Sequence, residues 1–438
     1  MQDLAPSYLD LMMSYTWFSK IPADDAFKVV EVELGLIYDM LYTKAPLIYS
    51  RSGIILRCIS FLLSVTASII FQVKIEKHAY SSIDVAITYL LFAASVFLEL
   101  YAFLCLVFSD QTMIWLVDKG GNALTSAIYY RLRKLTTSKR WSRSTSQYNL
   151  IRVCTENKPL KCLEFVGIDE MMRQMHVNRK DLNGGLHEFI FEHLRKKAEK
   201  MKEDFNFFEK KLRSKIIGQR GDGVLEREGL LKNFKWCTTE VEFSRSILVW
   251  HLAIEIFSRN EKDASNVSTS KCLSEYMMYL LVIRPNMLSK GFRDEGYLIT
   301  LGDKRCEGII QSYKTSPSYD NEWFQRDWKK NKSTVNGGLV LAKQLLESIS
   351  ESKKRWKMIE EVWMEMLTHA AAHCPWKKHA HALGRGGELL THVCFLMLHL
   401  GLSEQYEYNA SDEMVSVNTN HMTYLLCKYT KNISQVQW

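Results

Sequence analysis

The chain has 438 residues, 47% of them hydrophobic, and a formal net charge of +8. This length leaves room for a large hydrophobic core beside any membrane segment, and the ten cysteines form no Cys-x-x-Cys pair, so neither a zinc ribbon nor a disulfide framework is predicted. Basic residues are mostly interleaved with acidic ones, as in residues 195–215, and we therefore expect no nucleic-acid partner.

Residues 1–50 are predicted to form an amphipathic segment that precedes the membrane. The first 20 residues lack a basic start and a compact apolar core, so they do not resemble a signal peptide. Residues 24–42 predict a helix, because apolar side chains recur every three or four positions, at Phe27, Val30, Leu34, Ile37 and Leu41. Pro46 should end this helical segment at the membrane surface.

Residues 52–73 and 85–108 are two apolar stretches, each with only one formal charge, Arg57 and Glu99. About 20 helical residues cross the ~30 Å hydrocarbon core of a bilayer. The alternative is a buried helix pair in a soluble protein, but such helices are usually shorter and carry more polar interruptions. The sequence therefore predicts a transmembrane helical hairpin over residues 51–110, with the lipid bilayer as a partner.

The two intramembrane charges are candidates for an ion pair. In antiparallel spans Arg57 and Glu99 would differ in depth by about one helical turn, which an arginine side chain can bridge. The alternative is that Arg57 extends to the interface by itself and that Glu99 is protonated against other helices.

A basic juxtamembrane linker is predicted for residues 111–150. Six basic residues and no acidic one occur in residues 131–143, and such clusters favour the cytosolic side. Both flanks of the hairpin, and hence the N-terminus and the C-terminal domain, are therefore expected on the cytosolic side of the membrane. The sequence does not specify which cellular membrane this is. Four glycosylation sequons should consequently be unmodified, at Asn266, Asn331, Asn409 and Asn432.

Helical periodicity dominates the rest, which we divide into residues 151–335 and a C-terminal helical region, residues 336–438. Helices are predicted for residues 182–213, 241–257, 274–283, 338–350, 354–373 and 387–402, with loops at 218–223 and 312–332. The predicted fold class is mainly α: a transmembrane helical hairpin followed by a cytosolic all-helical domain.

Histidines gather near the C-terminus and could bind a divalent metal. Side chains four or seven positions apart share one helix face, and two such histidines can chelate one ion. No His-Glu-x-x-His string of metalloproteases occurs, so structural histidines or a pH-sensitive role are the alternatives. The candidate ligands are His369, His373, Glu388, His392 and His399.

A glycine-rich stretch, residues 384–387, precedes Glu388. Backbone amides at a helix start can bind an anion, but the stretch lacks the Gly-Lys-Ser/Thr string of a phosphate loop. Gly386 and Gly387 are more consistent with close backbone packing or a sharp start of a helix. No other catalytic motif occurs, and no cofactor is predicted.

Several strings resemble a plant membrane protein family. Residues 26–35 (AFKVVEVELG), 38–45 (YDMLYTKA), 98–100 (LEL) and 247–251 (ILVWH) resemble this family, whose N-terminal region is domain of unknown function 4220. Residues 355–356 (RW), 362–367 (VWMEML), 386–389 (GGEL) and 399–401 (HLG) resemble its companion, domain of unknown function 594. The matching positions include Trp250, His251, His379, Gly386, Gly387 and Glu388.

The resemblance implies a membrane-anchored helical plant protein whose relatives usually cross the membrane several times, and it implies no reaction. Because no catalytic constellation occurs, we expect a scaffold or regulatory protein with unidentified protein partners rather than an enzyme. The alternatives are a metal- or anion-dependent activity at the histidine and glutamate cluster, and a subunit of an oligomeric transporter that uses Glu99.

Overall fold

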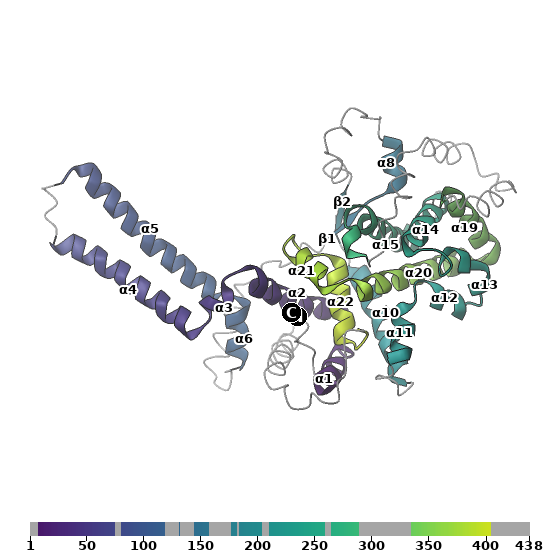
Figure 1. The fold of residues 1–438 in the computed structure, drawn as a ribbon, viewed down its shortest axis with the longest axis horizontal. Helices are drawn as coiled ribbons and strands as arrows, with labels where there is room; N and C mark the ends of the chain where they lie inside the picture. The colour runs from purple at the N-terminus through teal and green to yellow at the C-terminus, as the bar shows by residue number, and fades with distance from the viewer. Residues whose placement is uncertain are drawn as a thin grey trace. The chain divides into compact units, whose positions relative to one another are not determined.

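The computed structural model describes residues 8–74, 80–118, 131, 144–156, 177–181, 184–203, 210–258, 264–288 and 334–403. Helices make up most of these residues (Figure 1). The chain divides into two compact units. The helical unit contains residues 1–28 and 141–416, and the hairpin unit contains residues 29–140 and 417–438. The mainly helical fold class is thus confirmed.

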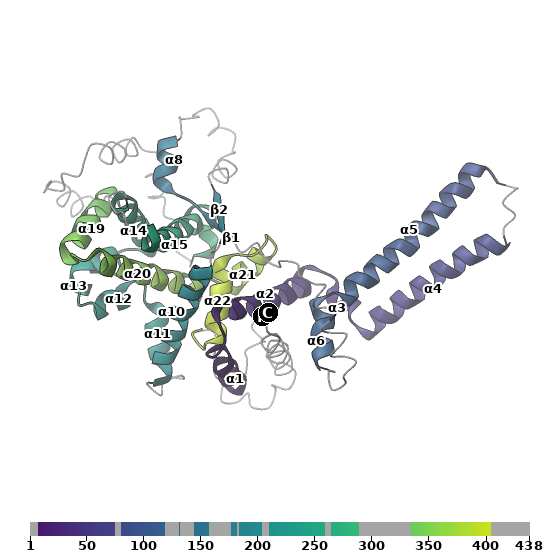
Figure 2. The ribbon, with the colours of Figure 1, turned by 180° about the vertical axis from the view of Figure 1, so that it is seen from behind.

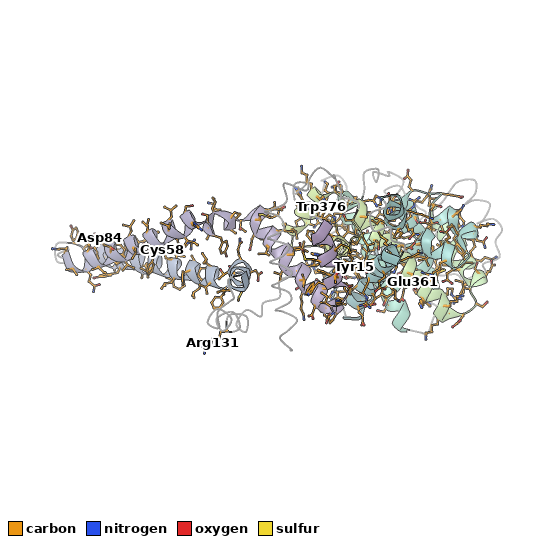
Figure 3. All side chains as sticks on the ribbon, turned by 90° about the horizontal axis from the view of Figure 1, so that it is seen from below. Tyr15, Cys58, Asp84, Arg131, Glu361 and Trp376 are labelled. Carbon is orange, nitrogen blue, oxygen red and sulfur yellow. The ribbon has the colours of Figure 1, made fainter. Side chains whose placement is uncertain are left out.

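Two long apolar helices, α4 (Arg51–Lys74) and α5 (Ser82–Val107), lie side by side in the hairpin unit (Figures 1 and 2). The most apolar 18-residue stretch has a mean hydropathy of 2.2 in α4 and 2.3 in α5. No residue in either stretch is buried. Cys58 of α4 is exposed, and Figure 3 shows side chains projecting from both helices. The predicted helices of spanning length are confirmed, and their exposure differs from that of core helices in a soluble protein.

The chain reaches α4 through α2 (Ala23–Tyr42) and the single turn α3 (Ala45–Ile48), and α6 (Asp110–Asp118) follows α5. A close corner joins α3 to α4. The Ser50 hydroxyl donates to the Leu47 carbonyl at 2.6 Å and accepts from the Gly53 amide at 3.0 Å. A Cβ on Gly53 would lie 2.0 Å from the same carbonyl oxygen, so this corner requires glycine.

The helical unit is built around long helices that enclose a core containing Trp250, Trp356 and Trp363. The long helices are α10 (Gly184–Glu203), α14 (Phe243–Phe257), α15 (Ala264–Ile283), α19 (Thr334–Ser348) and α20 (Ser352–His373). Shorter elements complete the unit: α1 (Tyr8–Phe18), α8 (Leu150–Glu156), α11 (Lys210–Gly218), α12 (Asp222–Arg227), α13 (Leu231–Phe234), η4 (Lys235–Cys237), η5 (Pro285–Met287), α21 (Trp376–Leu383) and α22 (Leu389–His399).

Three regions differ from the sequence predictions. Residues 144–147, expected in a linker, form strand β1 (Ser144–Gln147), which pairs antiparallel with β2 (Asn178–Asp181). The helix expected at residues 274–283 is the second half of the 20-residue α15, and the one expected at 182–213 is described as α10 and α11. Of the six clustered basic residues only Arg131 is described, and it is exposed; residues 312–332 also lie outside the described ranges.

Gly338 allows α19 to approach α14 closely, because a Cβ at this position would lie 2.6 Å from the Leu252 Cβ. We expect Gly338→Ala to lower the free energy of unfolding by about 1–3 kcal/mol, the usual cost of overpacking a core. Chemical unfolding followed by circular dichroism measures this change. Gly185→Ala in α10 is the matched control, since a Cβ there meets nothing within 4 Å and should be nearly neutral.

Candidate functional site

A buried polar site joins the start of α22 to α15. Gly386 and Gly387 have φ angles of +95° and +82°, which an L side chain rarely adopts, and they turn the chain sharply before Glu388. The Glu388 carboxylate accepts hydrogen bonds from the Tyr279 hydroxyl at 2.8 Å and the Tyr276 hydroxyl at 3.5 Å. The Arg284 Nε lies 3.9 Å from it. We call Glu388, Tyr276, Tyr279 and Arg284 the Glu388 cluster.

The Glu388 cluster is almost closed to solvent. Tyr276 and Tyr279 are buried, and the Tyr276 hydroxyl accepts a further hydrogen bond from the Leu390 amide at 2.8 Å. Burial raises the pKa of the Glu388 carboxyl, while the two tyrosine hydroxyls and Arg284 favour its ionised form. The arrangement can hold one negative charge against phenolic donors, and it anchors the glycine-rich turn to α15.

A double-mutant cycle measures the strength of this anchor. We expect Tyr279→Phe and Glu388→Gln to be coupled by about 1–3 kcal/mol, the range for a hydrogen bond to a charged group in a buried site. Unfolding free energies of the two single variants and the double variant provide the coupling. A coupling near zero would mean that the 2.8 Å contact contributes nothing to stability.

His369 and His373 lie together on α20, with ring centroids 4.1 Å apart. The Nδ1 of His369 lies 3.0 Å from the Gly218 carbonyl, and the Nδ1 of His373 lies 2.8 Å from the His369 carbonyl. Because a carbonyl only accepts, both Nδ1 atoms donate, and the two Nε2 atoms carry the lone pairs. Burial, aided by His373 and Arg220, lowers the pKa of His369 to about 3.

The histidines of α22 lie at other places and hold the N-terminal helices. His399 contacts the Ser14 hydroxyl at 2.8 Å through Nδ1 and stacks on the Phe18 ring at 4.2 Å. His392 donates from Nδ1 to the Glu388 carbonyl at 3.1 Å, and its ring lies 6.5 Å from that of Phe27. Within the described ranges no three His, Cys, Asp or Glu side chains are placed to hold one metal ion. The metal site stays a prediction.

His251, another position of the family motif, joins residue 150 to the core. Its Nε2 accepts a hydrogen bond from the Leu150 amide at 3.3 Å, so the neutral ring carries its proton on Nδ1 and donates it to the Ser274 hydroxyl at 2.9 Å. Burial lowers the pKa of His251 to about 4. His379 contacts the Thr391 hydroxyl at 3.1 Å, and Trp250 lies in the core. All three of these motif side chains are buried.

Glu365 of α20 is a polar residue whose role the sequence analysis did not recognise. One carboxylate oxygen accepts the backbone N–H groups of Gly221, Gly223 and Val224 at 3.1, 3.1 and 3.3 Å. The other oxygen lies 3.7 Å from the Lys197 Nζ. The sequence carries no distinct signal for this role, because Glu365 is one of three glutamates in α20. Residues 218–223, predicted as a flexible loop, are fixed by this carboxylate.

In the hairpin, Glu99 has a partner that the sequence analysis did not consider. The Ser60 hydroxyl of α4 donates to the Glu99 carboxylate at 2.8 Å, and Ser64 and Ser95 contact each other at 3.1 Å one turn away. No ion pair between Arg57 and Glu99 occurs in the described part of the chain, and their pairing stays a prediction. These two polar contacts between α4 and α5 therefore lie within about one helical turn of each other.

Comparison with known proteins agrees with the motifs. Residues 2–154 match a family described as domain of unknown function DUF4220, and residues 348–402 match one described as protein of unknown function DUF594. Neither a curated protein nor a solved structure matches the chain. The first match contains α1 to α6, β1 and the start of α8, and the second contains α20, α21 and α22. The chain thus carries DUF4220 at its N-terminus and DUF594 in its C-terminal region, as its sequence motifs indicated.

Proposed function

We propose that this protein is a membrane-anchored scaffold or regulatory protein, in which the hairpin crosses the bilayer and the helical unit binds partners. The observation that carries the proposal is that no residue is buried in the most apolar 18-residue stretches of α4 and α5, whose mean hydropathies exceed 2. Such a surface in water would be a large aggregation-prone patch, whereas hydrocarbon is its natural solvent. The carboxylate of Glu99, which would be costly in lipid if it were unpaired, has the Ser60 hydroxyl as a partner.

The helical unit is suited to a scaffold because it holds both flanks of the hairpin. Ser14 and Phe18, upstream of the hairpin, contact His399 of α22. Leu150, downstream of it, donates to His251 of α14. These contacts join the segments before and after the hairpin to the core of the helical unit. The contact of His399, in the DUF594 region, with Ser14 and Phe18, in the DUF4220 region, would explain why the two regions occur in one chain.

For the orientation we propose that both flanks face the cytosol. The basic residues in 131–143 follow the hairpin, and Lys44 and Arg51 precede or begin α4. Clustered basic side chains near span ends favour the cytosolic leaflet. The plant source implied by the resemblance is part of the same proposal.

Extraction and protease protection test the anchor and its orientation separately. In microsomes the full chain should resist extraction at alkaline pH, and tags at both termini should be digested by added protease without detergent. A variant with Leu62→Lys and Leu91→Lys, both at exposed positions of the hairpin helices, should be extracted. Extraction of the unaltered chain would refute the anchor, and protected tags would refute only the orientation.

The scaffold role is tested by purifying the full chain from native membranes, with protein identification and elemental analysis on the same sample. We expect stoichiometric protein partners. A stoichiometric metal that is lost in His392→Ala would instead favour the metal-dependent alternative. The His392→Gln variant keeps a polar side chain at this buried position and controls for unfolding.

A further inference from the structure

Large apolar side chains are exposed next to α4 as well as on the hairpin itself. Outside α4, α5 and the turn between them, the described ranges expose seven large apolar residues: Met13, Tyr38, Met40, Leu41, Tyr42, Leu47 and Leu346. Five of these seven fall within residues 38–47. A run of this kind beside a candidate span is not expected from the scattered exposure of apolar residues on ordinary surfaces.

The exposure begins abruptly within α2. Val30, Leu34 and Leu36 are buried, whereas Tyr38, Leu41 and Tyr42 are exposed by 40%, 46% and 47%. Positions 38, 41 and 42 lie on one helix face, and the rings of Tyr38 and Tyr42 stack with centroids 5.3 Å apart. The last turn of α2 therefore presents a preformed aromatic and aliphatic surface.

Local contacts fix this surface relative to the hairpin. The α3–α4 corner, closed at Gly53, places Leu47 directly beside the first turn of α4, and Leu47 is 69% exposed. The middle of α2 approaches α6, where a Cβ on Gly35 would lie 3.9 Å from the Asp110 carboxylate. Burial and the Asp110 carboxylate raise the pKa of Asp39.

We propose that residues 38–49 form an interfacial collar, which lies in the headgroup region of the bilayer and fixes the depth of the hairpin. This inference rests on the proposed membrane anchor. Three observations favour lipid as the occupant rather than a protein: the surface directly precedes α4 in the chain, its aromatic residues are tyrosines, and its nearby cations are the exposed Lys44 and Arg51. Tyrosine and basic side chains are the usual residues at this depth.

Photoactivatable lipids test the collar on the full chain in lipid nanodiscs. One lipid carries a diazirine near the headgroup and a second carries it near the end of the acyl chain, and mass spectrometry locates the labelled peptides. The headgroup probe should label residues 38–49, and the acyl-chain probe should label the middle of α4 and α5. Leu346, exposed by 38% in the helical unit, is the matched control and should remain unlabelled by both.

The outcomes separate the collar from the anchor. Labelled hairpin helices with unlabelled residues 38–49 would overturn the collar and leave the anchor intact, whereas an unlabelled hairpin would refute both. Labelling of Leu346 equal to that of residues 38–49 would also overturn the collar. A variant with Leu41→Ser, Tyr42→Ser and Leu47→Ser should lose most of its headgroup-probe label. Its thermal unfolding should change only slightly, because all three side chains are at least 46% exposed.

Discussion

Replacing Glu365 by alanine will lower the free energy of unfolding of the helical unit by about 3–5 kcal/mol, the usual cost of removing one partner from a buried ion pair. The loss has two sources. Three backbone N–H groups between Gly221 and Val224 lose their acceptor, and the Lys197 ammonium, whose side chain is 12% exposed, loses its counter-charge. Denaturant unfolding of the full chain in nanodiscs, followed by circular dichroism, measures the change.

Glu361, one turn earlier on α20, is the control for this prediction (Figure 3). It pairs with Arg227, whose side chain is 58% exposed, so Glu361→Ala should cost less than about 1 kcal/mol. Glu365→Gln should fall between the two, because an amide oxygen can accept some of the three N–H groups but leaves Lys197 uncompensated. Equal effects of Glu361→Ala and Glu365→Ala would show that the carboxylate does not fix this loop.

Glu365 also shows what could not be predicted from sequence. Its apolar neighbours at positions 362, 363, 366 and 367 made the helix predictable, because burial imposes a three-to-four spacing. Its partners at Gly221 and Gly223 are 144 and 142 residues away. No local pattern specifies contacts over such a separation, and a single buried acidic residue reveals only that some partner must exist.

The histidines illustrate the same limit. Helical spacing correctly placed His369 with His373 on α20, but it suggested a common metal site with His392 and His399. Those two residues contact Glu388, Ser14 and Phe18, through side-chain directions that depend on how α1 and α22 pack, and the metal site stays a prediction. The hairpin was easier to predict, since length and apolar composition alone determine whether a helix can cross a bilayer.

The stability difference between the wild-type chain and His251→Gln will shrink as the pH falls from 6.5 to about 4. Burial lowers the pKa of His251 from 6.5 to about 4, with Glu255 opposing and Lys271 assisting the shift. The folded state therefore keeps this ring neutral while the unfolded state binds a proton. Its contribution to stability is complete above pH 6.5 and is lost toward pH 4, by about 1.4 kcal/mol per pH unit within that window.

At pH 7.5 we expect the variant to be less stable by about 1–3 kcal/mol, because glutamine can replace at most one of the two hydrogen bonds of His251. Ser274→Ala is the matched control: it removes the hydrogen-bond partner at 2.9 Å and keeps the titrating ring. Its stability deficit should remain nearly constant over the same pH range. A difference between wild type and His251→Gln that stays constant from pH 7.5 to 4.5 would mean that His251 does not couple folding to proton binding.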